Sequence, residues 1–119
     1  MLFPCISIKK IKNEMPTEVE NQAGIDAIKA APKAAVDFYA DWCPPCKMIG
    51  PKFNALAEEY PGIQFFKVNV DNADVNPLVL EFEISAMPTF VFLKDGAAVN
   101  RLEGASEEIL KDYLEKLNA

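Results

Sequence analysis

Histidine is absent from this sequence, and cysteine is scarce. Without imidazole neither a Ser-His-Asp triad nor a Cys-His pair can form, and metal sites that depend on histidine ligands are excluded. The three cysteines are Cys5, Cys43 and Cys46, which is too few for the multi-disulfide framework of a small secreted protein. We therefore expect a protein of a reducing compartment and place it in the cytoplasm.

Long hydrophobic runs and basic stretches are also lacking. The longest apolar runs fall far short of the roughly 20 residues of a membrane-spanning helix, so no membrane association is expected. With 18 acidic and 12 basic residues the formal net charge is −6, which argues against nucleic acid as a partner. A chain of 119 residues, half of them hydrophobic, fits one compact domain with an apolar core.

The first 14 residues differ in composition from the rest. Three lysines lie among apolar residues there, and no acidic residue precedes Glu14. The order is poor for a signal peptide, because the basic residues follow the apolar ones, and the lack of arginine is poor for a mitochondrial presequence. We predict an N-terminal extension over residues 1–14, with Cys5 incidental to function, and a folded domain over residues 15–119. Organelle import through the extension stays open.

Strand-like and helix-like segments alternate along the chain, which is typical of an α/β fold with helices covering a sheet. Short β-rich or apolar segments predict strands, and apolar residues at helical spacing predict helices. The predicted strands are 17–21, 34–40, 63–70, 89–94 and 97–103. The predicted helices are 22–31, 44–60 with a kink at Pro51, 76–82 and 106–117.

Local signals refine this assignment. The dipeptide Asp95-Gly96 suits a type I′ turn and predicts a hairpin between the last two strands. Ser106 is the expected N-cap of the last helix. Residues expected on the buried faces of the two longest helices are Met48, Ile49, Phe53, Leu56, Ala57 and Tyr60 in the first, and Ile109, Leu110, Tyr113, Leu114 and Leu117 in the second.

The Cys-x-x-Cys sequence lies where a strand passes through a short turn into a helix. Proline is favoured in a first helical turn, so a helix opening at Pro44 puts Cys43 at its N-cap. The positive end of the helix favours a thiolate there, which lowers the pKa of Cys43 and makes it the expected nucleophile. Cys46 lies on the same face one turn later, within reach of a disulfide. A bridge closing so short a loop adds little stability, and reversible redox chemistry explains it better.

Two features of the motif leave alternatives open. Pro44 and Pro45 lack N–H groups, so the Cys46 N–H is the remaining nearby donor for the Cys43 sulfur. Whether the stiffness of this turn or its loss of donors dominates the redox potential is open. A Cys-x-x-Cys pair can also be half of a zinc site, but no second pair or histidine is present to complete it. A metal shared between two chains is the remaining form of that alternative.

Residues 36–47, Val-Asp-Phe-Tyr-Ala-Asp-Trp-Cys-Pro-Pro-Cys-Lys, closely resemble the active-site segment of the thioredoxin family. The resemblance covers about residues 15–119. Further matches, in chain order, are Pro51 at the helix kink, Lys67 to Asp71 as the third strand, Met87-Pro88-Thr89 as the cis-proline loop, and Gly104-Ala105 after the last strand. It implies the thioredoxin fold, a central mixed five-stranded sheet flanked by four helices. A lowered pKa of the first cysteine is itself a known property of this family.

The resemblance also implies roles for residues outside the motif. By itself, Asp37 reads as a carboxylate at a wet strand end and Lys67 as a surface lysine. The resemblance implies instead that Asp37 is a buried base that deprotonates the second cysteine through water, and that Lys67 lies nearby and tunes its charge. An X-Pro bond is usually trans, but the resemblance implies a cis Pro88 facing the cysteines, with the Met87 backbone free to pair with a substrate strand.

A substrate-binding rim is expected around the reactive sulfur. By resemblance it consists of Trp42, Pro44, Pro45, Met87, Pro88, Gly104 and Ala105. Packing of Trp42 in the core is the alternative for that residue.

These observations predict a thiol–disulfide oxidoreductase that reduces protein disulfides. The Cys43 thiolate attacks the substrate, and Cys46 then releases the product and leaves a Cys43–Cys46 disulfide. The resemblance implies no bound cofactor or metal, disulfide-containing protein substrates, regeneration by a flavin-dependent thioredoxin reductase using NADPH, and a monomer. The alternatives are an oxidant or protein disulfide isomerase of the same fold, because Pro44-Pro45 replaces the familiar Gly-Pro, as in some eukaryotic thioredoxins including plant h-type ones. Less favoured are a non-catalytic binding module and a metal-bridged dimer.

Overall fold

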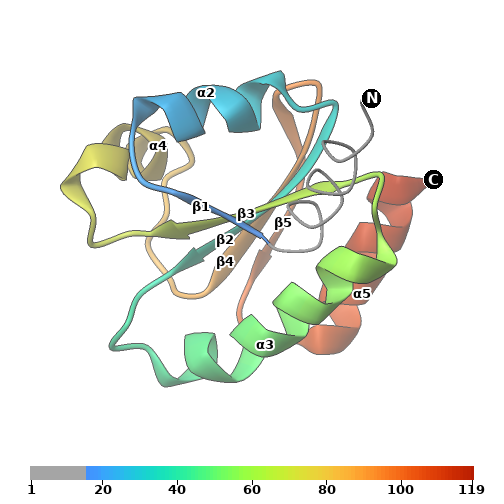
Figure 1. Cartoon of the computed structure of the whole chain (residues 1–119). Coiled ribbons are helices and arrows are strands. Elements are labelled where there is room, and N and C mark those ends of the chain that lie inside the picture. The colour runs from blue at the N-terminus through green and yellow to red at the C-terminus, as the bar shows by residue number, and fades with distance from the viewer. Residues whose placement is uncertain (1–15) are drawn as a thin grey trace, which may run out of the picture.

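The structure is a computed structural model that describes residues 16–119 (Figure 1). The extension predicted over residues 1–14, with Cys5, lies outside the described residues, so the domain boundary stays a prediction. In chain order the elements are β1 (Thr17–Val19), α2 (Gln22–Ala30), β2 (Lys33–Tyr39), α3 (Pro44–Glu59), β3 (Gln64–Asn69), the 3-10 turn η1 (Ala73–Val75), α4 (Asn76–Glu81), β4 (Thr89–Lys94), β5 (Ala97–Glu103) and α5 (Glu107–Asn118). Every predicted strand and helix is present, with ends shifted by at most two residues.

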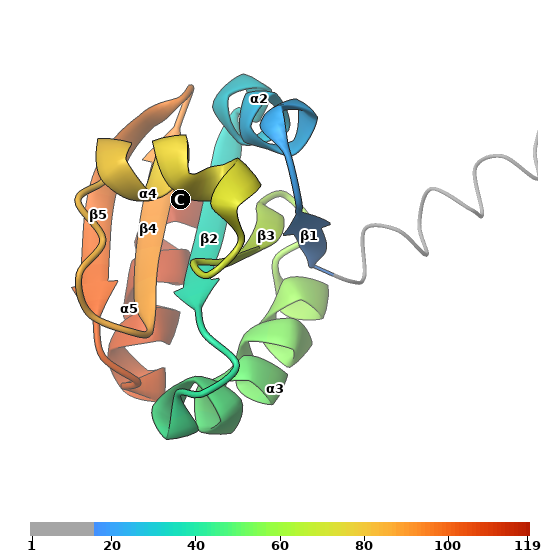
Figure 2. The same ribbon diagram turned by 90° about the vertical axis from the view of Figure 1, so that its left-hand side faces the viewer.

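The five strands form one mixed sheet in the order β1-β3-β2-β4-β5. β1, β3 and β2 run parallel, and β4 and β5 are antiparallel to their neighbours. Helices α3 and α5 cover one face, and α2 and α4 cover the other (Figures 1 and 2). This is the mixed five-stranded sheet with four helices that the resemblance implied.

Alternation along β2 assigns its side chains to the two faces of the sheet. Ala35 belongs to the core under α3 and α5, with Phe53 and Phe90. Val36 and Phe38 belong to the core under α2 and α4. Both faces of β2 are buried, as its mostly apolar sequence predicts. Asp37 falls between Val36 and Phe38, so its side chain lies on the α3 face.

Local geometry confirms the hairpin and the helix cap. Asp95 and Gly96 both have positive φ, 52° and 85°, as a type I′ turn between β4 and β5 requires. The Ser106 side chain accepts a hydrogen bond from the Ile109 N–H and caps α5. The 3-10 turn η1 was not predicted from the sequence. The Asn72 side chain forms it locally by accepting a hydrogen bond from the Asp74 N–H.

Two residues predicted to be buried are exposed, so those predictions were wrong. Met48 on α3 is 73% exposed and Ile109 on α5 is 41% exposed. Each lies just outside the stripe that contacts the sheet. The residues three or four positions further along the same side of each helix, Lys52 and Asp112, are also exposed. The buried stripes are therefore narrower than the apolar patterns of the two helices.

Strand directions bring three connecting segments together at one end of the sheet. In the register, Phe38 on β2 lies beside Thr89 on β4, and Thr89 lies beside Glu103 on β5. The end of β2, the start of β4 and the end of β5 therefore meet. The segments that follow β2, precede β4 and follow β5 contain the residues that the resemblance selected.

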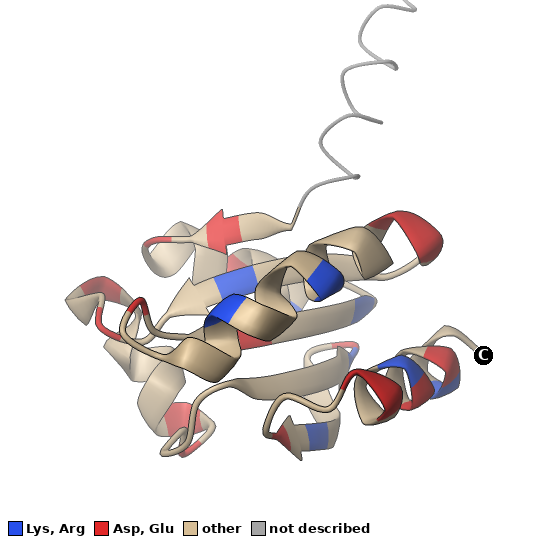
Figure 3. Ribbon diagram, turned by 90° about the horizontal axis from the view of Figure 1, so that it is seen from below, with Lys and Arg blue, Asp and Glu red and all other residues tan. Residues whose placement is uncertain are grey.

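Charges of both signs are interspersed along α5, and basic residues elsewhere on the face drawn in Figure 3 are scattered. On that face the described part of the chain has no continuous basic band of the kind that follows a phosphate backbone. Within residues 16–119, no helix is both long and apolar enough to cross a bilayer.

Candidate active site

Cys43 is the N-cap of α3, as predicted from Pro44. Its backbone is extended, with φ −97° and ψ 109°, and its Sγ accepts a hydrogen bond from the Cys46 N–H at 3.3 Å. Pro44 and Pro45 occupy the first helical positions, so this N–H is the donor that the first turn offers, as expected. The positive end of α3 and this single amide favour negative charge on the Cys43 sulfur.

Cys43 and Cys46 form a disulfide, with their Cα atoms 5.3 Å apart. Both side chains are almost fully covered, at 3% and 6% exposure. They form a small apolar cluster with Ala40, against which Met87 packs. A disulfide spanning one helical turn can open and close without moving the body of α3, since both sulfurs come from the same turn.

The peptide bond between Met87 and Pro88 is cis, as the resemblance implied. The Met87 carbonyl oxygen lies 3.6 Å from Cys43 Sγ. The next carbonyl, that of Pro88, accepts a hydrogen bond from the Gly104 N–H at 2.9 Å. Gly104 has a φ of 119°, and a Cβ there would meet no atom within 4 Å, so the space beside Gly104 is open. Pro88 itself is buried.

Trp42 is 65% exposed, so the alternative of core packing is wrong. Its indole N–H donates to Asp71 Oδ2 at 2.9 Å. Asn69 links the two segments, because its Oδ1 accepts from the Asp71 N–H at 3.0 Å and its amide donates to Asp41 at 3.4 Å. Asp41, Asn69 and Asp71 hold the indole in place beside the disulfide, and sequence reasoning assigned them no such role.

Asp37 is 1% exposed in the middle of β2, so it does not lie at a wet strand end. Its Oδ1 has no hydrogen-bond partner among the described residues. Burial raises the pKa of this carboxyl from its ordinary 3.8 to about 7, an effect that Lys67 partly offsets and Glu18 increases. A carboxyl with this pKa exchanges its proton near neutral pH.

Three charged residues lie side by side across adjacent strands. Lys67 on β3 is in register with Asp37 on β2 and with Glu18 on β1. The Lys67 ammonium lies 4.9 Å from the centre of the Tyr39 ring, and the Tyr39 hydroxyl donates to the Glu18 carboxylate at 2.9 Å. The predicted proximity of Lys67 to Asp37 is confirmed. Glu18 and Tyr39 were missed, and strand register is the signal that joins them to the site.

A cavity of about 310 Å³ opens beside the disulfide on the side of Cys46. Its lining residues come from the end of β2, the first half of α3 and β3, and they are Tyr39, Ala40, Asp41, Cys46, Lys47, Gly50, Pro51, Asn54 and Lys67. Gly50 keeps this space open next to Lys67, because a Cβ at Gly50 would lie 3.6 Å from the ammonium. The cavity brings solvent to Cys46 and Lys67.

Among residues 16–119, no three or more Cys, Asp or Glu side chains gather in an arrangement that could hold a metal ion. The chemically reactive groups of the site are the disulfide and the buried carboxyl of Asp37. This combination can exchange disulfides and transfer protons.

Comparison with known proteins agrees with this geometry. The thioredoxin family model matches residues 8–116. The chain is 38% identical to thioredoxin H5 of Arabidopsis thaliana over 99 residues, covering 83% of this chain and 82% of that protein. It is 39% identical to the mitochondrial thioredoxin-3 of Saccharomyces cerevisiae over 111 residues, covering 93% and 80%. The crystal structure of oxidised mitochondrial thioredoxin 3 from Saccharomyces cerevisiae superposes with a TM-score of 0.78 at 37% identity, covering 86% of this chain and 95% of that one.

Proposed function

Because this chain belongs to the thioredoxin family and is a thiol–disulfide oxidoreductase, we propose that it reduces protein disulfides with Cys43 as the attacking sulfur and Cys46 as the resolving one. The observation that carries this assignment is the position of Cys43 at the N-cap of α3, with its Sγ accepting from the Cys46 N–H. Cys46 lies inside the helix and faces the cavity.

The reaction consists of two displacements. The Cys43 thiolate attacks one sulfur of a substrate disulfide, forming a mixed disulfide and releasing the other substrate sulfur as a thiolate. Cys46 then loses its proton and attacks the Cys43 sulfur, which breaks the mixed disulfide and releases the second substrate thiolate. Two electrons have passed to the substrate, and Cys43 and Cys46 are left as a disulfide.

Asp37 accepts the Cys46 proton through water in the cavity. A base working near neutral pH needs a pKa close to that pH, and burial raises the pKa of Asp37 to about 7. In support of this role, the cavity lined by Cys46 and Lys67 offers space for water beside the thiol, and Lys67 is the neighbour of Asp37 in the strand register. Lys67 tunes the charge of Asp37 from the neighbouring strand.

The substrate lies as an extended segment across the end of the sheet at which the end of β2, the start of β4 and the end of β5 meet. It pairs with the backbone of Met87, whose carbonyl lies next to Cys43. The surrounding surface is built from the exposed residues Trp42, Pro44, Pro45 and Ala105, together with the partly buried Gly104 and the buried Pro88. An apolar, open rim of this kind accepts many sequences, because the backbone carries most of the contact.

Thioredoxins exchange electrons with a reductase on one side and with disulfide substrates on the other. For this chain we assign the flavin-dependent reductase that uses NADPH, action as a monomer and residence in the cytoplasm. Because one similar thioredoxin is mitochondrial, organelle import through residues 1–14 is the alternative for its location.

Reduction of insulin disulfides by the chain, driven by NADPH and a thioredoxin reductase, tests the proposed function. Precipitation of the reduced insulin chains and oxidation of NADPH should proceed together. The second candidate function is that of an oxidant or protein disulfide isomerase, and the reason to consider it is the Pro44-Pro45 turn. Equilibration of the Cys43–Cys46 pair in glutathione buffers tests this candidate. A reductant is oxidised in buffers that leave an oxidant or isomerase reduced.

The charged row across the sheet predicts two opposite shifts in the titration of Asp37. Lys67→Met removes the positive neighbour and should raise the pKa of Asp37 by roughly one unit, whereas Glu18→Gln removes a negative neighbour and should lower it. The carboxyl carbon resonance of Asp37, followed by NMR across pH in the oxidised protein, measures both. Glu20→Gln, on the exposed end of the same segment, is the control and should leave the midpoint unchanged. A shift in the same direction for both variants would contradict the arrangement.

A further inference from the structure

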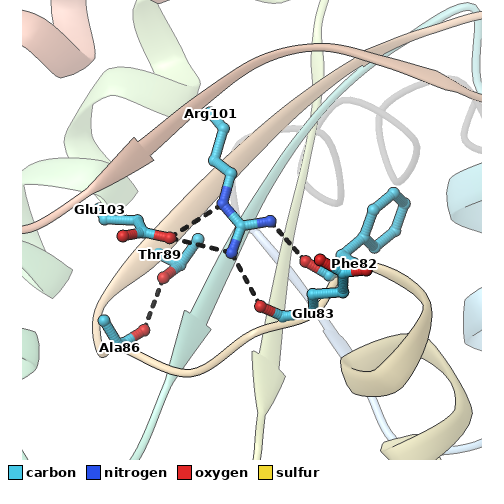
Figure 4. A network of polar contacts seen from close by, with 6 residues as sticks. All are labelled: Phe82, Glu83, Ala86, Thr89, Arg101 and Glu103. Carbon is cyan, nitrogen blue, oxygen red and sulfur yellow. Dashed lines mark hydrogen bonds and ion pairs between the residues drawn. The ribbon is translucent and has the colours of Figure 1, made fainter.

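Arg101 on β5 forms the centre of a polar network beside the cis-proline segment (Figure 4). Its Nη1 donates to the Phe82 carbonyl, and its Nη2 donates to the Glu83 carbonyl at 3.0 Å. Its Nε donates to Glu103 Oε2 at 3.1 Å, and the Nη2 also pairs with that oxygen at 3.0 Å. One half-buried guanidinium therefore joins the end of α4 to β5.

The segment held by Arg101 leads directly to Met87 and Pro88. It leaves α4 through Glu83, which has a positive φ of 52°, and it contains no further helix or strand before β4. At its far end, the Thr89 hydroxyl donates to the Ala86 carbonyl, and the Gly104 N–H donates to the Pro88 carbonyl at 2.9 Å. Arg101 thus fixes the near end of the segment, and the start of β4 and the end of β5 fix the far end.

We propose that Arg101 is a positioning residue for protein substrates, because it holds the segment that presents the Met87 backbone. This proposal rests on the proposed function, in which an extended substrate pairs with that backbone. A guanidinium is suited to this task, since its planar array of donors reaches two carbonyls and a carboxylate at once. A segment that is already ordered loses less conformational entropy when the substrate binds.

Arg101 does not contribute to the reactivity of the disulfide itself. Cys43 and Cys46 lie at the start of α3, and the polar contacts of the Arg101 guanidinium are with Phe82, Glu83 and Glu103. Loss of the guanidinium should therefore weaken the binding of protein disulfides and leave the exchange step intact. A small aromatic disulfide, which has no backbone to pair with Met87, should react as before.

Arg101→Met keeps an aliphatic side chain and removes the donors. Stopped-flow mixing of the pre-reduced variant with insulin should show the half-saturating concentration raised roughly tenfold, as expected for one lost ordering contribution, with an unchanged limiting rate. The rate with 5,5′-dithiobis(2-nitrobenzoate) and the equilibrium with glutathione should stay within twofold of the unmodified protein. Amide hydrogen exchange at Met87 should become faster. Arg101→Lys, which retains one charged donor group, should recover part of the loss.

Two controls separate positioning from general stability. Glu103→Gln removes the carboxylate partner but keeps both carbonyls of the segment within reach of Arg101. Lys29→Met breaks the exposed ion pair between Lys29 and Glu81 of α4, so it perturbs the same helix without touching the segment. Neither should raise the half-saturating concentration for insulin as Arg101→Met does.

The proposal is overturned if Arg101→Met slows the reactions with insulin and with the small disulfide equally, or if it lowers the melting temperature without raising the half-saturating concentration for insulin. Unchanged exchange at Met87 would overturn it as well. Failure of the proposed function is recognised separately, because the unmodified protein would then not reduce insulin while the exchange measurement would still report on Arg101.

Discussion

Cys43→Ser is expected to abolish the reduction of protein disulfides, lowering the rate by about a thousandfold or more, because an alcohol is almost entirely un-ionised at neutral pH. Cys46→Ser should have a different effect. Its Cys43 sulfur still sits at the N-cap of α3 and still attacks, but the mixed disulfide has no internal thiol to resolve it. The variant should therefore accumulate as a covalent complex with its substrate in a one-to-one ratio.

Mass spectrometry of each variant after incubation with a disulfide-containing protein distinguishes these outcomes. Cys43→Ser should remain unmodified, Cys46→Ser should carry the substrate through Cys43, and reductant should release it. The double variant is the control for reaction at other positions. The assignment would fail if Cys43→Ser formed the complex and Cys46→Ser did not. Far-ultraviolet circular dichroism should be unchanged in all three, since the disulfide closes a very short loop and adds little stability.

Asp37→Asn should stabilise the fold at neutral and alkaline pH. Burial raises the pKa of Asp37 to about 7, whereas the unfolded value is near 3.8. The folded protein therefore binds more protons than the unfolded chain between these values, and the stability contributed by the protonated carboxyl is lost as pH rises through that window. Two pKa values about three units apart correspond to roughly 4 kcal/mol. Asparagine avoids this loss because it carries no charge.

Denaturant unfolding of the oxidised protein at a series of pH values measures this effect. The gain from Asp37→Asn should be near zero around pH 4, rise through pH 7 and level off above it. Glu58→Gln, which replaces an exposed acid on α3, is the matched control and should show no such dependence. A gain that is independent of pH would mean that packing, rather than the charge of Asp37, is responsible.

The same substitution should slow the resolving step. Without the carboxyl, removal of the Cys46 proton depends on solvent, and loss of a general base lowers a rate on the order of a hundredfold. Decay of a pre-formed mixed disulfide on Cys43 measures this step directly. The unmodified protein should accelerate through pH 7, and Asp37→Asn should not. An unchanged pH–rate profile would remove Asp37 from the mechanism.

The sequence predicted the elements well where the signal was local. The hairpin at Asp95-Gly96 and the helix start at Pro44 depend on neighbouring residues, and both are confirmed. The exposure of Met48 and Ile109 could not be predicted, because the apolar pattern of a helix gives a direction but not the width of the surface it meets. That width depends on how α3 and α5 lie on the sheet.

In the candidate site, too, local sequence signals could be predicted and long-range neighbours could not. Cys43 and Cys46 are three positions apart, so their pairing could be inferred without the fold. Lys67, Glu18 and Tyr39 join Asp37 only through the pairing of β1, β3 and β2, which fixes the neighbours across the sheet. The resemblance supplied Asp37 and Lys67, but no pattern in the sequence indicated Glu18 or Tyr39. The same holds for Arg101, because two of its partners, Phe82 and Glu83, lie at the end of α4, 19 and 18 residues earlier in the chain.

Because both sulfurs arise from one helical turn, oxidised and reduced forms of this protein should present almost the same shape. A donor of electrons and an acceptor must approach the same small opening, since Cys43 is only 3% exposed. Neither partner can be excluded by fit alone. The direction of electron transfer is then set by the redox potentials and the concentrations of the partners. The shape of this protein does not set it.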